Sequence, residues 1–128
     1  MSLRSPFSRL LGQRSANEGT EHWWIQRVTS VALLLLGAWF LIRVRGVVSF
    51  QEADLYAWVA YPLNALMLLL LSVTLVWHSM LGVQVVIEDY VHGPAIKVVS
   101  LTFNKFAHVF FGLAAVFPVL TVSLGGSG

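Results

Sequence analysis

Three long apolar stretches alternate with polar segments along the chain, and each is as long as a membrane-spanning helix. The first covers about residues 24–43 when the arginines at its edges are counted, the second lies within 61–87, and the third within 96–124. A helix that crosses the hydrocarbon core needs about 20 mostly apolar residues. The pattern therefore predicts an all-α membrane protein with three transmembrane helices.

Turn-forming residues mark the ends of these predicted spans. Pro62 suits the first turn of the second helix, a Gly-Pro pair at 93–94 opens the third, and a glycine-rich tail from Gly125 closes it. Residues 1–21 are polar, and we expect them to form a retained N-terminal arm on the cytoplasmic or matrix side. Residues 22–128 then form the three-helix anchor domain.

The composition supports this interpretation and limits the possible functions. The chain is 57% hydrophobic and only 11% charged, with a mean hydropathy of +0.76, whereas soluble domains carry about 25% charged residues. Its 128 residues suffice for three spans and leave no room for a sizeable soluble catalytic domain. The absence of cysteine excludes disulfides, iron–sulfur clusters on this chain and covalent haem attachment.

The distribution of basic residues predicts the orientation in the membrane. With three spans, the N-terminal arm and the second loop share one side of the membrane, and the first loop and the tail share the other. One side carries Arg4, Arg9, Arg14, Arg27 and Lys97, and the other carries Arg43 and Arg45. Because cytoplasmic loops are enriched in Lys and Arg, five against two predicts that the N-terminus is inside.

His78 is the first candidate for chemistry, because it lies deep in the stretch from Leu55 to Ile87, which contains no Asp, Glu, Lys or Arg. Ionisable residues at membrane depth are costly and usually functional. Neutral imidazole is a common metal ligand, including for haem iron. The alternative is that His78 forms only a hydrogen bond between helices.

Three further residues lie on or near the helical stripe of His78. Gly82 is one turn away, where a glycine allows a flat macrocycle or another helix to approach closely. Asp89 is eleven residues from His78, which is about 20° around a helix, and Tyr90 is roughly 18 Å along the axis. The alternatives are a packing glycine and an ordinary helix end with an interfacial tyrosine.

The stretch from His78 to Tyr90 resembles the pattern H-x-x-x-G-x-x-x-x-x-x-D-Y in the second span of the smaller cytochrome b anchor subunit of succinate dehydrogenase, respiratory complex II. The resemblance extends to His22-Trp-Trp-Ile-Gln-Arg27 before the first span, to the three-helix layout and to the length. It covers nearly the whole chain and implies that the protein is part of a heteromeric helix bundle.

The resemblance implies a role for each matching residue. His78 would be one axial ligand of a haem b, and a companion cytochrome b-type anchor subunit would supply the second. Tyr90 would donate a hydrogen bond to ubiquinone, with Asp89 in the neighbouring proton network, and Gly82 would leave space beside the haem. Arg27 and His22 would contact the haem propionates, for which a guanidinium is well suited; a snorkelling anchor is the alternative for Arg27.

The function implied is that of a membrane anchor of succinate:ubiquinone oxidoreductase in the bacterial inner membrane, with the mitochondrial inner membrane as the alternative. FAD and iron–sulfur clusters would belong to the partner flavoprotein and iron–sulfur subunits, so the isolated chain should have no activity. One rival is the anchor of a quinol:fumarate reductase. Another is a non-redox scaffold or transporter component, in which His78, Lys105 and His108 serve packing or proton relay; otherwise we expect Lys105 and His108 to make interhelical or lipid contacts.

Overall fold

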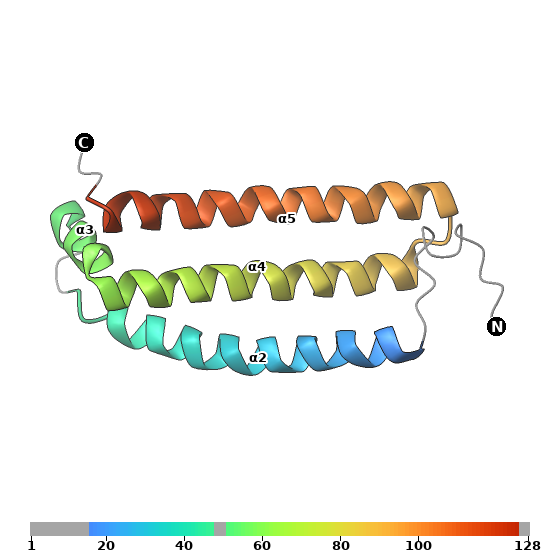
Figure 1. Cartoon of the computed structure of the whole chain (residues 1–128), viewed down its shortest axis with the longest axis horizontal. Helices are drawn as coiled ribbons and strands as arrows, with labels where there is room; N and C mark the ends of the chain where they lie inside the picture. Colours follow the sequence, from blue (N-terminus) through green and yellow to red (C-terminus); the bar gives the residue numbers. More distant parts are fainter. Residues whose placement is uncertain (1–15, 48–50, 126–128) are drawn as a thin grey trace.

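The computed structural model describes residues 16–47 and 51–125, and over these residues it contains helices, turns and short connections. The helices are α2 (Ala16–Val44), α3 (Glu52–Ala60), α4 (Pro62–Tyr90) and α5 (Pro94–Ser123). Figure 1 shows α2, α4 and α5 lying lengthwise beside one another, with α3 at one end. The segments Gly19–Val44, Pro62–Tyr90 and Pro94–Ser123 are long and apolar enough to cross a membrane. The all-α fold with three spans is therefore confirmed.

Proline and glycine determine where the second and third spans begin and end. Pro62 and Pro94 occupy the first turns of α4 and α5, where the missing N–H costs no helical hydrogen bond. Just after α5, Gly125 has a φ of 84°, a left-handed conformation that suits glycine. The helices extend beyond the spans expected from the sequence. The helix α2 begins at Ala16, before residue 24; α4 ends at Tyr90, after residue 87; and α5 begins at Pro94, before residue 96.

The nine-residue helix α3 was not predicted from the sequence. Glu52 and Asp54 lie in its first turn, where carboxylates interact favourably with the positive end of the helix dipole. After α3, Tyr61 is extended and starts α4 in a new direction. The side chain of Asn64, only 3% exposed, donates a hydrogen bond from Nδ2 to the backbone oxygen of Trp58 at 2.9 Å. This bond ties α3 to the beginning of α4.

The central helix is α4, which packs against α2 on one side and α5 on the other, while the described parts of α2 and α5 do not touch. At the α4–α5 interface, Gly112 lies against Val76, because a Cβ added to it would lie 3.4 Å from Cγ1 of Val76. Asn104, 4% exposed, donates from Nδ2 to the backbone oxygen of Met80 at 3.0 Å. A polar contact therefore links the two helices inside an apolar interface.

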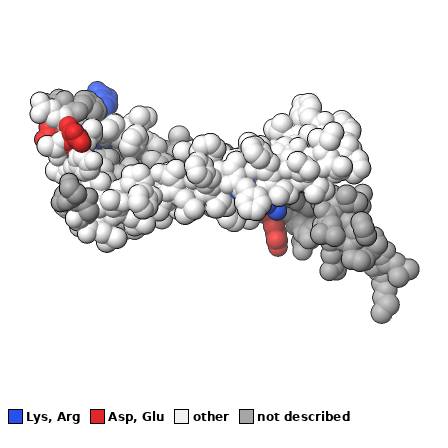
Figure 2. Space-filling view, turned by 90° about the horizontal axis from the view of Figure 1, so that it is seen from above, with Lys and Arg blue, Asp and Glu red and all other residues white. Residues whose placement is uncertain are grey.

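Most apolar side chains face outward. Among the described residues, only Val47, Ala65 and Leu81 are buried hydrophobic residues, whereas large side chains such as Phe103 and Phe117 are more than 70% exposed. The face in Figure 2 is almost entirely uncharged, with charged side chains gathered near the end that holds α3 and at one further place along the molecule. Such an apolar surface suits lipid or other membrane helices rather than water.

Part of the sequence-based description lies outside the described residues. This applies to residues 1–15 of the predicted arm, and α2 already begins at Ala16, within the segment assigned to that arm. Three of the five basic residues that predicted the orientation are in residues 1–15. The described part of the chain does place Lys97 at the opposite end of the helix layer from Arg43, so these two cations flank opposite ends of the spans.

Candidate functional site

His78 lies on the side of α4 that faces α2, and its side chain is half-buried. Its ring nitrogen Nδ1 is 2.9 Å from the hydroxyl oxygen of Thr29 on α2. The same hydroxyl lies 2.7 Å from the backbone oxygen of Ile25 and 3.1 Å from that of Gln26. The imidazole is therefore connected to the neighbouring helix through Nδ1.

A pocket lies one to two turns from His78 toward the end of α4, between α2 and α4. Its volume is about 510 Å³, and it is lined by Gly19, His22, Trp23, Gln26, Gly82 and Val85. A Cβ added to Gly82 would lie 3.5 Å from Nε2 of Gln26, which is ordinary van der Waals contact. Gly82 therefore faces α2 across the edge of this pocket.

The amide of Gln26 leaves a polar atom unsatisfied beside this pocket. Its Oε1 is buried and has no hydrogen-bond partner among the described residues. A buried acceptor without a donor costs on the order of 1 to 3 kcal/mol. A donor from a bound molecule, from water or from a neighbouring chain would remove this cost.

The structure separates the two residues predicted to contact propionates. His22 lines the pocket, but Arg27 does not and is exposed. The guanidinium carbon Cζ of Arg27 lies 4.8 Å from the ring centroid of Trp23, a cation–π contact. Because Trp23 itself lines the pocket, this contact holds the Arg27 guanidinium next to the pocket wall rather than inside it.

Asp89 and Tyr90 lie at the end of α4, and both are exposed, Tyr90 by 78%. This end is attached to α5, because Nζ of Lys97 donates to the backbone oxygen of Glu88 at 3.0 Å. Within α4, Nε2 of Gln84 donates to Oε1 of Glu88 at 2.9 Å. Glu88 thus forms hydrogen bonds through both its main chain and its side chain. The next two residues, Asp89 and Tyr90, therefore follow a point where α4 is held against α5.

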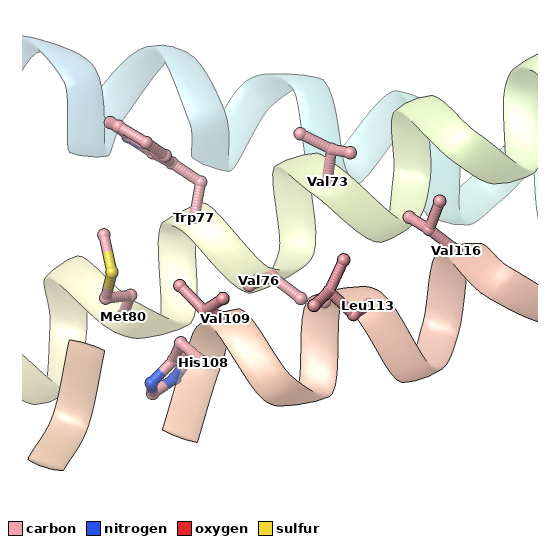
Figure 3. A pocket seen from close by; sticks show the side chains of 9 residues that line it. Val73, Val76, Trp77, Met80, His108, Val109, Leu113 and Val116 are labelled. Carbon is pink, nitrogen blue, oxygen red and sulfur yellow. The ribbon is translucent and has the colours of Figure 1, made fainter. Parts of the chain in front are cut away.

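Lys105 and His108, although only three residues apart, have different surroundings. Lys105 is exposed, whereas His108 is half-buried and its Nδ1 lies 2.8 Å from the backbone oxygen of Asn104. His108 also lines an apolar pocket of about 310 Å³ between α4 and α5, where it is the only ionisable lining residue (Figure 3). The interhelical position expected for these residues is thus found for His108.

Sequence reasoning missed three polar residues that face another helix: Thr29, Gln26 and Asn104. The available signal was a polar side chain inside a predicted span. Within the described ranges, no group of three or more His, Asp or Glu residues could hold a metal ion.

Comparison with known proteins gives consistent results. The family described as succinate dehydrogenase/fumarate reductase transmembrane subunit matches residues 1–121. A succinate dehydrogenase hydrophobic membrane anchor subunit of Rickettsia bellii (strain RML369-C) is 31% identical over 109 residues, which cover 84% of this chain and 78% of that protein. The subunit of the same name from Paracoccus denitrificans is 32% identical over 129 residues, covering 98% and 96%. No solved structure matches the chain significantly.

Proposed function

The chain belongs to the succinate dehydrogenase/fumarate reductase transmembrane-subunit family, and from this premise we propose that it anchors a succinate:ubiquinone oxidoreductase to the bacterial inner membrane. In this proposal the flavoprotein and iron–sulfur subunits carry FAD and the iron–sulfur clusters, and a companion cytochrome b-type anchor subunit completes the membrane domain. The names of the two relatives, both succinate dehydrogenase subunits, favour succinate oxidation over fumarate reduction.

We further propose that His78 is an axial ligand of haem b, with the second histidine from the companion subunit. The observation that carries this proposal is an imidazole in the middle of a membrane span, bonded through one ring nitrogen and thus oriented. The other ring nitrogen remains as the coordinating atom. When bound, such a haem would supply one-electron transfer.

The pocket one to two turns from His78 offers space for such a group, although His78 itself does not line it. Gly82 lines the pocket and presents no side chain toward it, so a flat ring can approach α4 there. In the proposal, His22 on the pocket wall and Arg27 at its edge bind propionates. Arg27 would reach them from its position on the Trp23 ring, where its cation–π contact holds the guanidinium beside the pocket.

Tyr90 and Asp89 are proposed to bind and protonate ubiquinone at the end of α4. The Tyr90 hydroxyl donates a hydrogen bond to a quinone oxygen, and this bond strengthens as negative charge develops on that oxygen during reduction. The Asp89 carboxylate takes part in proton delivery. Both side chains are exposed at the end of α4 that Lys97 holds against α5. At this position, a ligand from the lipid and a docked subunit can both reach them.

The test of the haem proposal is the visible spectrum of the purified complex. In His78→Ala, the reduced b-type absorption band is expected to disappear, while succinate oxidation with an artificial electron acceptor continues on the partner subunits. His108→Ala is the matched control, since it removes another half-buried imidazole from the membrane spans. A haem spectrum that is unchanged in an assembled His78→Ala complex would refute the ligand assignment.

A further inference from the structure

The hydroxyl of Thr29 has three polar neighbours but only one proton. The backbone oxygens of Ile25 and Gln26 can only accept hydrogen bonds, and they lie 2.7 Å and 3.1 Å from Oγ1. The third neighbour is Nδ1 of His78, at 2.9 Å on another helix. Nδ1 can donate or accept, depending on which ring nitrogen carries the proton.

Only one arrangement of protons satisfies all of these contacts. If Thr29 donates its proton to the backbone oxygens of its own helix, its lone pairs accept a hydrogen bond from Nδ1–H of His78. If Thr29 instead donates to Nδ1, no proton lies between its Oγ1 and the two backbone oxygens. These oxygen atoms are all acceptors and would repel one another at such short distances. The first arrangement is therefore favoured, and it puts the ring proton of neutral His78 on Nδ1 and the lone pair on Nε2.

We propose that Thr29 is a positioning residue for His78, holding the imidazole in the tautomer and orientation in which Nε2 can bind the haem iron. This inference rests on the proposed function, because it takes His78 as an iron ligand. Histidines that bind metals usually donate their other ring N–H to an acceptor, which fixes the ring and makes the coordinating nitrogen more basic. Thr29 provides that acceptor from a different helix.

The local structure makes Thr29 a rigid acceptor. Its side chain is held by the backbone of α2, and α2 packs along α4. The bond lies between two membrane spans, where no bulk water competes for the hydroxyl. A shift of α2 relative to α4 would therefore be transmitted directly to the plane of the imidazole.

The test uses the purified complete complex and measures haem content and the haem reduction potential. Thr29→Val keeps the shape of the side chain and removes the acceptor. Loss of an orienting partner typically costs 10- to 100-fold in metal affinity or activity. We expect the preference of the site for ferric over ferrous haem to fall about tenfold, which raises the potential by about 59 mV for one electron.

Two further variants separate the hydroxyl from helix packing. Thr29→Ser retains the hydroxyl and should restore the wild-type potential. Ser30→Ala is the matched control, because the Ser30 hydroxyl also donates to the backbone oxygen of Gln26, at 2.7 Å, but is exposed and makes no contact with His78. It should leave the potential unchanged. If Thr29→Val does not assemble, Thr29→Ala is measured instead, with the same expectation.

The outcomes distinguish this inference from the proposal beneath it. If His78→Ala loses haem while Thr29→Val has the potential of Ser30→Ala, the inference is overturned and the ligand assignment stands. If Thr29→Ser shifts the potential as far as Thr29→Val does, the hydroxyl is not responsible, and the inference is again overturned. If His78→Ala retains haem, the ligand assignment fails and the inference fails with it.

Discussion

Replacing Tyr90 by Phe removes one hydroxyl from the proposed quinone site and keeps the aromatic ring. Tyr90 is 78% exposed, and its hydroxyl has no hydrogen-bond partner among the described residues. The substitution should therefore change neither the stability of α4 nor the haem content. In the proposed site, it would remove a hydrogen bond to a quinone oxygen that gains negative charge during reduction.

The size of the effect follows from the strength of such a bond. A hydrogen bond to a charged group contributes about 2 to 3 kcal/mol, and each 1.36 kcal/mol changes a rate about tenfold. Quinone reduction should therefore fall roughly 30- to 150-fold. The assay is succinate:quinone activity divided by the artificial-acceptor activity of the same preparation, so that losses in the partner subunits cancel.

Tyr61→Phe is the matched control for this experiment. Tyr61 adjoins the opposite end of α4 and is also an exposed aromatic residue, by 56%, at a predicted membrane edge. Its substitution should leave the activity ratio unchanged. If the ratio for Tyr90→Phe equals that for Tyr61→Phe, Tyr90 is an interfacial anchor and the quinone site lies elsewhere.

Two further predictions concern the fold. Asn104→Leu removes the bond to the backbone oxygen of Met80 and should lower the stability of the complex against SDS by about 1 kcal/mol. The control Thr102→Val removes an exposed hydroxyl that is bonded within α5 and should leave this stability unchanged. Equal stabilities of the two variants would show that the Asn104 bond contributes nothing. In this cysteine-free chain, a cysteine placed at His92 should react with a membrane-impermeant reagent only from the inside and one at Ala53 only from the outside; the reverse result would invert the orientation predicted from the basic residues.

The sequence predicted the spans well because their signal is local. An apolar run of sufficient length must be helical in a membrane, whatever it packs against. The same reasoning missed α3, because a segment of nine residues that includes Glu52 and Asp54 is too short to be recognised as a membrane span. Its helical conformation is supported by the contact of Asn64 with Trp58, which local composition does not reveal.

The candidate site was predictable only in part, for a related reason. The depth of His78 in its span can be read from the sequence, but the contact with Thr29 depends on how α2 and α4 are aligned. Both helices are apolar on nearly all sides, so hydrophobic periodicity does not define which faces meet. The position of Arg27 could not be predicted for the same reason. It follows Gln26, which lines the pocket, but Arg27 itself lies on the exposed side of α2.

The double role of the Thr29 hydroxyl has a consequence for how the chain enters the membrane. During synthesis, α2 emerges before α4, because it precedes α4 in the chain. The Thr29 proton already has acceptors in the backbone of α2, so the helix can partition into lipid without an unsatisfied donor. In the proposed arrangement, the Thr29 hydroxyl that accepts from His78 is therefore already oriented on α2 when α4 inserts.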